Sequence, residues 1–467
     1  MDQILFKILM FFKAFSEKWE KVFHGGRIQK TAQALQKKMV SLFDFSKQKT
    51  DGFLIVSLNQ VAVEIVYVKF FSEGVQVLAY DVYQLFPGSP DEEAVIDYFI
   101  ADFLRKNAIM EQKVILNISD EDAVAIHCLT LPELPEGEIL EAAKWKLKEE
   151  VPFDLENAPI GWQYARKYED DDGSKHVDLI FAVAEIKAVH RYLSCVINCG
   201  LQPISITTGL LNYTNILNHL TELPAVSAVV DIDYAATTLS IYSGAKLLFV
   251  RGIPVSWEMF SQALTKLIVS DQGSTALSLE EAEIIKNTYG IPLDEFQVIK
   301  GNISGLHIMS LLRPLLEALV RELKLSFNYF AMNFDMDKPT VLFTDGGGAD
   351  LKNLEEYLCK ELNIKVSRLP LPDCVYWNKL KEKDSPKEAL QKIANTIAVA
   401  LGDSKAINLL PKEIKTQKTE FFQRVSLRIG GITIAAVFLI LLFFSKSQVH
   451  DYRNRLKAAQ THLEIIG

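Results

Sequence analysis

The sequence has few cysteines. Only five are spread over 467 residues, an odd and sparse set that offers no disulfide framework. Cys195 and Cys199 are separated by three residues, which is helical spacing and not the CxxC spacing of a redox pair or a zinc site. We therefore expect plain buried thiols and a reducing compartment for the main body of the chain.

Positive charge is also in short supply. The chain carries 50 Lys and Arg against 59 Asp and Glu, a net charge of −9. A nucleic-acid binder needs a clustered basic face to neutralise phosphates, so this class of function is excluded. Residues 1–50 are the exception, with a net charge of +6 that leaves −15 for the remainder. Neither a catalytic triad nor a zinc motif is visible.

Most of the excess apolar character of the chain sits at its two ends. Residues 1–23 predict an amphipathic helix within a basic arm over 1–50, which either lies in a membrane interface or packs on protein. Residues 429–445 carry no charge and would rise about 26 Å as a helix, so we predict a transmembrane helix over 427–446. Apolar residues in 447–467 then alternate at spacings of three and four, the pattern of a short coiled coil.

Between these ends, the pattern predicts an α/β body over residues 51–402. A first lobe opens with three β-rich segments, and a second lobe over about 225–402 repeats that opening. An inserted subdomain over about 120–205 combines strands with one helix. The expected strands are 53–58, 61–70, 75–85, 113–118, 123–129, 161–168, 177–184, 226–232, 238–242 and 246–250, and the expected helices are 91–106 and 135–150.

Several local motifs stand out in this body. Residues 341–350 (VLFTDGGGAD) predict a strand that ends in three glycines before a helix over 351–358; such glycines let the backbone approach a flat ligand. Residues 277–290 (LSLEEAEIIKNTYG) predict a helix that begins with a Ser278/Glu281 capping box. Residues 131–135 (LPELP) and 150–153 (EVPF) flank the helix of the inserted subdomain.

Together these motifs resemble the PilM family of type IV pilus assembly proteins, within the actin-like ATPase superfamily. The resemblance implies a two-lobed actin-like fold with an inserted subdomain, and ATP held between the lobes with Mg²⁺. Carried over residue by residue, it implies a nucleotide site made of Asp231, Thr237, Glu283, Lys286, Gly346, Gly347 and Gly348.

The predicted phosphate hairpins depart from that family's pattern. Ser57 and Asn59 stand where an Asp and a Gly are usual, and Asp233 stands where a Gly is usual. The side chain of Asp233 blocks close approach of the backbone to a phosphate, and its carboxylate repels phosphate oxygens. These departures argue against ATP hydrolysis, and we therefore expect a scaffold and not an enzyme. The alternatives are an active assembly ATPase and a component similar to GspL of type II secretion.

A second resemblance follows the body. Residues 406–411 (AINLLP) look like the N-terminal peptide of PilN, and a polar linker to residue 426, the predicted span and the coiled coil follow in the same order. The chain therefore resembles PilM fused to the start of PilN. This implies a single-pass bacterial inner-membrane protein with a cytoplasmic body, a periplasmic tail and PilN/PilO-type partners. The partner-binding residues would be Ile407, Asn408, Leu409, Leu410 and Pro411.

The link between body and peptide is short. Residues 403–406 span at most about 14 Å. If the groove for the peptide lies farther away than this, the peptide must bind a neighbouring molecule, and the protein would assemble into chains or rings.

Overall fold

The computed structural model describes residues 52–71, 74–85, 91–120, 122–266, 268–270, 273–301, 303–377, 393–402 and 407–411, with Ile414 and five positions between 446 and 454. The chain divides into two compact units, 1–52 and 53–467, and every element below belongs to the second. The predicted basic arm and membrane span lie outside the described residues, as does most of the predicted coiled coil. Within the described residues, no helix combines the length and the apolar character needed to cross a membrane.

The first lobe is built on a six-stranded mixed sheet, ordered β18-β3-β2-β1-β4-β8. The first three strands form an antiparallel meander, and β4, β8 and β18 each pair in parallel with a neighbour. Strand β8 therefore forms one edge. The strands are β1 (Phe53–Leu58), β2 (Ala62–Phe71), β3 (Gly74–Gln84), β4 (Lys113–Ile118), β8 (Gln202–Thr207) and β18 (Val375–Trp377).

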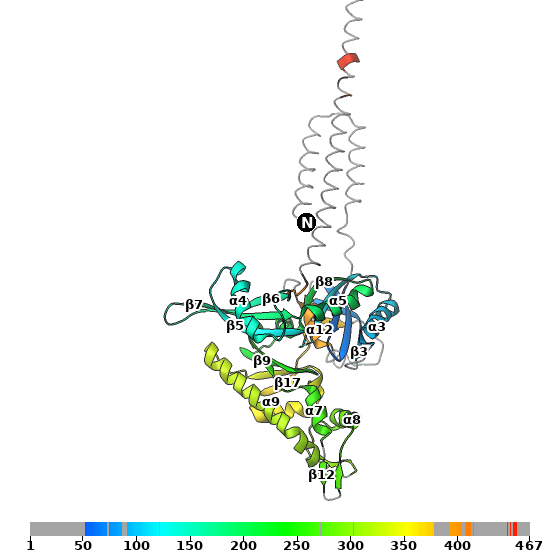
Figure 1. The fold of residues 1–467 in the computed structure, drawn as a ribbon, viewed down its shortest axis with the longest axis vertical. Helices are drawn as coiled ribbons and strands as arrows, with labels where there is room; N and C mark the ends of the chain where they lie inside the picture. Colours follow the sequence, from blue (N-terminus) through cyan, green and yellow to red (C-terminus); the bar gives the residue numbers. More distant parts are fainter. Residues whose placement is uncertain are drawn as a thin grey trace, which may run out of the picture. The chain divides into compact units, whose positions relative to one another are not determined.

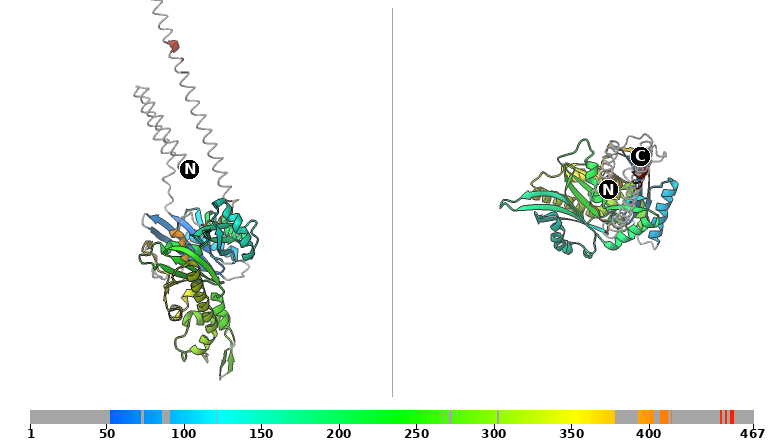
Figure 2. Two further views of the ribbon diagram at one scale, coloured as in Figure 1. Left: turned by 90° about the vertical axis from the view of Figure 1, so that its left-hand side faces the viewer. Right: turned by 90° about the horizontal axis from the view of Figure 1, so that it is seen from above.

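Helices cover both faces of this sheet (Figures 1 and 2). Alternate residues of β1 point to opposite faces: Leu54 and Val56 pack in a cluster with helices α3 (Glu92–Lys106) and α5 (Ile186–Asn198), whereas Ile55 packs with α12 (Ala394–Leu401). All three side chains are fully buried. This double coverage explains why β1 is an unbroken apolar run rather than an alternating one.

A smaller antiparallel sheet, ordered β5-β7-β6, is inserted between β4 and β8. It is formed by β5 (Val124–Pro132), β6 (Ile160–Glu169) and β7 (Lys175–Ala184), and α4 (Glu136–Glu150) packs against it. The long β6–β7 hairpin is labelled in Figure 1. Strand β6 is an edge strand.

The second lobe repeats the opening of the first. Its sheet is ordered β11-β10-β9-β16-β17, an antiparallel meander continued by parallel strands. Figure 1 shows the long helix α9 running along it. The elements of this lobe are β9 (Val226–Ile232), β10 (Thr237–Ser243), β11 (Lys246–Ile253), β16 (Val341–Asp345), β17 (Lys365–Arg368), α7 (Trp257–Leu264), α8 (Leu279–Tyr289), α9 (Gly305–Phe334) and α10 (Leu354–Leu362).

Shorter elements complete the described chain. They are η2 (Gly209–Leu211), α6 (Tyr213–Leu217), η3 (Gly347–Asp350), and two small hairpins made of β12 (Ile268–Ser270), β13 (Gly273–Thr275), β14 (Val298–Lys300) and β15 (Ile303–Ser304). One predicted element is displaced. The helix expected over 351–358 begins only at Leu354, because the glycine segment first forms the 3₁₀ turn η3 and Asn353 has a left-handed φ of 67°.

Candidate functional site: the interlobe hairpins and the peptide groove

The tips of the β1–β2 and β9–β10 hairpins contact each other between the lobes. The Asn59 side-chain amide donates a 3.3 Å hydrogen bond to Asp233 Oδ2. Each side chain also holds its own turn: Asn59 Oδ1 accepts from the backbone N–H groups of Val61 and Ala62, and Asp233 Oδ1 accepts from that of Tyr234. Two of the three positions that depart from the family pattern, Asn59 and Asp233, are thus hydrogen-bonded to one another.

Behind these tips, two aspartates and a tyrosine form a buried cluster. Asp231 and Asp345 are direct neighbours on the parallel strands β9 and β16. The hydroxyl of Tyr213 lies 2.5 Å from Asp231 Oδ2 and 2.8 Å from Asp345 Oδ2. A phenol has one proton, so one of these two hydrogen bonds needs a proton on a carboxyl group. Burial raises the pKa of Asp345, which favours the protonated form there.

Two further acids in this region have raised pKa values. Desolvation raises the pKa of Glu64 on β2 to about 8, although the Thr396 hydroxyl donates a hydrogen bond to its carboxylate; the charges of Asp233 and Asp345 add to the rise. Desolvation also raises the pKa of Asp233 to about 6, against the opposing effect of its hydrogen bonds. The region is therefore acidic and poorly hydrated.

The residues at the hairpin tips do not fit the triphosphate of Mg·ATP. The cavity that Asn59, Asp120 and Asp233 line has a volume of about 10 Å³, enough for one water molecule at most. Carboxylates here would repel phosphate oxygens. The Ser57 hydroxyl is engaged within the first lobe, where it accepts a 2.6 Å hydrogen bond from the Asn117 side chain. In the part of the chain that the structure describes, no three metal-ligating side chains gather around a cation site.

Glu283 and Lys286 form a separate cluster between α7 and α8. Lys286 is only 1% exposed; its ammonium lies 3.7 Å from the centre of the Trp257 ring and donates hydrogen bonds to Glu283, at 2.8 Å, and to the Ser261 hydroxyl. Burial lowers the pKa of Lys286. The structure brings these two predicted site residues together, within a network that joins α7 to α8.

The glycine segment packs against the end of β9. Gly346 has a φ of 80°, and a Cβ there would lie 2.3 Å from an Asp231 carboxylate oxygen. A Cβ on Gly348 would lie 2.3 Å from Ile232 Cγ2, whereas Gly347 faces open space. The first and third glycines therefore serve close packing of the chain on β9. The other predicted residue on these hairpins, Thr237, is buried and donates a 2.6 Å hydrogen bond to the Val255 carbonyl.

The segment 407–411 lies along the free edge of β8. The Leu409 N–H donates a 2.8 Å hydrogen bond to the Ile206 carbonyl. In return, the Ile206 N–H donates to the Asn408 side-chain oxygen at 3.2 Å, and that oxygen also accepts from the Leu410 N–H at 2.9 Å. The Asn408 side chain thus takes the place of a backbone carbonyl in pairing with β8. Both polar backbone groups of Ile206 are satisfied by the segment.

Apolar packing holds the same segment from the other side. Ile407, Leu409 and Leu410 are 7%, 0% and 4% exposed and belong to the core cluster of the first lobe. Gly161 on β6 supplies the room, because a Cβ there would lie 2.5 Å from Ile407 Cγ2. We call this space between the edges of β8 and β6 the peptide groove. Burial of each large aliphatic side chain is worth about 1.5–3 kcal/mol.

The segment therefore occupies the groove of its own chain. The expectation that the segment binds a neighbouring molecule applied to a groove beyond the reach of the four-residue link, and here the segment pairs with β8 of its own chain. The five predicted partner-binding residues are brought together as one docked segment.

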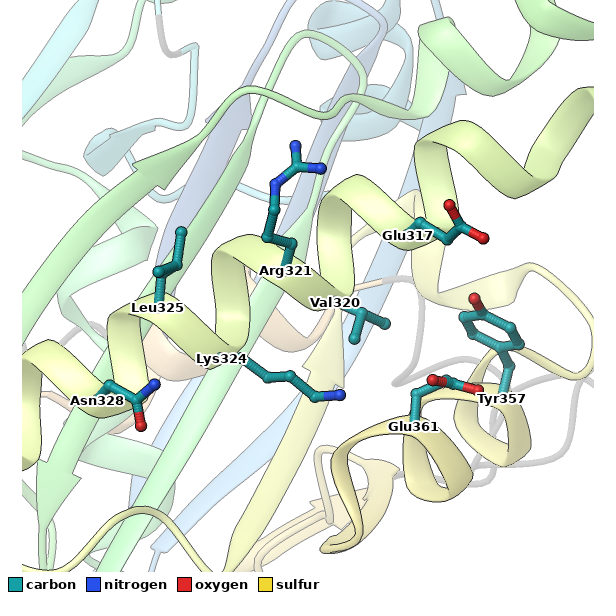
Figure 3. A pocket seen from close by; sticks show the side chains of 8 residues that line it. All are labelled: Glu317, Val320, Arg321, Lys324, Leu325, Asn328, Tyr357 and Glu361. Atoms are coloured by element: carbon teal, nitrogen blue, oxygen red, sulfur yellow. The ribbon is translucent and has the colours of Figure 1, made fainter.

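A different concavity, of about 270 Å³, lies between α9 and α10. Figure 3 shows Val320 and Lys324 of α9 pointing towards Tyr357 and Glu361 of α10, while Arg321 and Leu325 point elsewhere. It is an open surface groove of mixed charge. It shares no residue with the hairpin tips or the peptide groove.

Two members of the buried cluster around Tyr213 were not found by sequence reasoning. Asp345 directly precedes the three glycines and could have been included, because it ends the same predicted strand. Tyr213 has no local signature: it lies in a short helix, and its two partners are 18 and 132 residues away. The pairing of β9 with β16 brings the two aspartates together, and α6 carries Tyr213 to them.

Two lobes that each begin with an antiparallel meander and continue with parallel strands define the class of actin-like ATPase folds. The chain belongs to the family "Type IV pilus assembly protein PilM", whose family model matches residues 88–403.

Among solved structures, the first described below shows the same fold, and the other two are more distantly similar. A structure described as the "PilM-PilN type IV pilus biogenesis complex" is 24% identical, with a TM-score of 0.59, and covers 75% of this chain and 97% of its own. The ethanolamine utilization protein EutJ from Carboxydothermus hydrogenoformans is 14% identical (TM-score 0.39; 69% and 85% covered). MreB5 of Spiroplasma citri bound to AMPPNP is 13% identical (TM-score 0.39; 76% and 98% covered). No curated protein matches the sequence.

Proposed function

We propose that the protein is a membrane-tethered actin-like scaffold of the type IV pilus inner-membrane platform. It would link cytoplasmic components to PilN/PilO-type partners without hydrolysing ATP. The observation that carries this proposal is the pairing of Leu409 with Ile206, because it seats a segment resembling the PilN peptide in a formed groove. The complex named for the similar structure, PilM with PilN, supports a PilN-type partner.

The hairpin geometry supports the scaffold role over the ATPase role. The phosphate end of the cleft is occupied by the Asn59–Asp233 contact and by carboxyl groups. Purified full-length protein in detergent should therefore release no phosphate from Mg·ATP above the rate of a no-protein blank. Turnover that depends on Mg²⁺ and survives further purification would favour the assembly ATPase instead.

Tethering and orientation can be tested by cysteine labelling in cells. Cys359 is an exposed native thiol on α10 and reports on the body. A Thr461→Cys variant reports on the tail beyond the predicted span. We expect a membrane-impermeant maleimide to label position 461 in intact spheroplasts, and Cys359 only after permeabilisation. Equal labelling of both sites before permeabilisation would contradict a cytoplasmic body with a periplasmic tail.

A further inference from the structure

The peptide groove has the features of a site that takes one extended strand. It lies between two edge strands, β8 and β6, of different sheets. A free sheet edge presents unpaired N–H and C=O groups, and adding a strand satisfies them. Here Ile206 provides both groups to the segment. Without the segment, this backbone and the apolar wall behind it would be open to a second strand.

The contacts also select the sequence of the strand. The groove recognises Asn408 through its side-chain oxygen, which accepts hydrogen bonds from the backbone N–H groups of Ile206 and Leu410. An alanine at this position would leave both N–H groups without that acceptor. Leu409 is fully buried, and Ile407 fits over Gly161 because that position has no Cβ. A strand of the same sequence from another molecule would satisfy the same contacts.

We propose that residues 407–411 act as a built-in ligand that keeps the groove closed to a separate peptide of the same sequence. The inference rests on that part of the proposed function which assigns the segment as a docking peptide; it is independent of the membrane tether and of ATP. A ligand joined by a link of only four residues has an effective concentration of about millimolar or more. A free peptide at micromolar concentration is therefore outcompeted, and the groove of the intact chain works as an intramolecular clamp.

The consequence concerns partners. A PilN-type partner that carries the same peptide can enter the groove only after the chain's own segment has left it. Recruitment of such partners by the intact chain must use other surfaces, and release of the segment would switch the groove to a recruitment site.

The test measures binding of a fluorescent peptide with the sequence of residues 405–412 (KAINLLPK) to the full-length protein in detergent, by anisotropy. The intact chain should bind at least about tenfold more weakly than an Asn408→Ala/Leu409→Ala variant, whose own segment has lost its contacts. The matched control is Leu325→Ala/Asn328→Ala, the same residue types at exposed positions of α9. It should behave like the intact chain.

A second variant guards against misfolding of the first. A protease site inserted between residues 404 and 405 leaves every groove contact intact and, once cut, turns the intramolecular contact into a bimolecular one. Cutting should raise peptide binding by about tenfold or more, and a KAIALLPK peptide should not bind. Equal binding before and after cutting would overturn the proposal, as would no binding to either the cut protein or the double variant while both remain folded.

Light scattering on the same samples separates a segment docked in its own chain from one exchanged between copies. The intact chain should have the mass of a monomer. An oligomer that dissociates in Asn408→Ala/Leu409→Ala would overturn the intramolecular clamp. Detection of Mg²⁺-dependent ATP turnover, or failure of the expected tail labelling, bears only on the proposed function, so the two failures are distinguishable.

Discussion

Asn59 and Asp233 join the two lobes through one hydrogen bond of 3.3 Å between their side chains. Each side chain is also fixed by backbone N–H groups of its own turn, so the contact is made by two pre-ordered tips. In a fold whose lobes are expected to meet across a nucleotide, these residues meet directly. At the hairpin tips, the contact between the two lobes is therefore made by the protein's own side chains.

The first prediction concerns ATP. Replacing Asp233 by Gly removes one carboxylate and the contact that joins the hairpins, so Mg·ATP should bind Asp233→Gly at least about tenfold more tightly than the unaltered protein. Titration calorimetry measures this, with the exposed Asp337→Gly as control. Equally tight binding by the unaltered protein would show that the closed hairpins do not govern access.

The second prediction is a pH dependence of stability. The pKa of Glu64 is about 8 in the folded protein and close to 4.5 when unfolded, so folding takes up a proton between these values. Stability should therefore fall as pH rises from about 5 to 8, by up to about 1.4 kcal/mol per pH unit for one proton. Asp233 adds to this fall between 3.8 and about 6.

Urea unfolding at several pH values measures this slope. Glu64→Gln removes the titrating group and should flatten the profile above pH 6. The exposed Glu280→Gln on α8 should leave it unchanged. A Glu64→Gln profile as steep as that of the unaltered protein would show that another group is responsible.

The third prediction concerns the peptide groove. In Gly161→Ala, the new methyl group would lie 2.5 Å from Ile407 Cγ2, so the segment must move or leave, at a cost of about 1–3 kcal/mol. Hydrogen exchange of residues 407–411 should speed up, and Ile407→Ala in the same chain should partly restore protection by relieving the clash. Gly137→Ala on α4, where a Cβ meets nothing within 4 Å, is the control. Unchanged exchange in Gly161→Ala would contradict the described groove.

The fourth prediction separates a structural from a nucleotide role for Lys286. Glu283→Gln leaves the buried ammonium without its charged partner; because Glu283 is 40% exposed, the loss should be about 1–2 kcal/mol rather than the larger cost of a fully buried pair. Lys286→Met keeps the stacking on Trp257 and should cost less. Thermal unfolding of both variants, without nucleotide, measures the difference. The opposite order of stabilities would count against the internal network.

Much of the fold could be predicted because its signals are local. The bounds of β1, β4 and β9 are those expected from apolar runs between turn residues, and the capping box at Ser278 is present at the start of α8. The start of α10 was misplaced because a glycine run does not reveal whether it leads into a helix or a 3₁₀ turn.

The site was harder to predict because its contacts are distant in sequence. The five residues of the docked segment were recognised from their order before the predicted span, but the edges that receive them depend on which strands end the two sheets. Gly161 gave no signal of its own. The Tyr213 cluster is assembled by strand order, and strand order cannot be read from any single segment.

The docked segment also determines which part of the body would bear a pulling force on the C-terminal part of the chain. Any pull on the chain beyond residue 414 reaches the docked segment before it reaches α12, and the hydrogen bonds to Ile206 pass it to the edge of the six-stranded sheet. Force from the tail is thereby borne by the sheet of the first lobe and shared with β6 through Ile407.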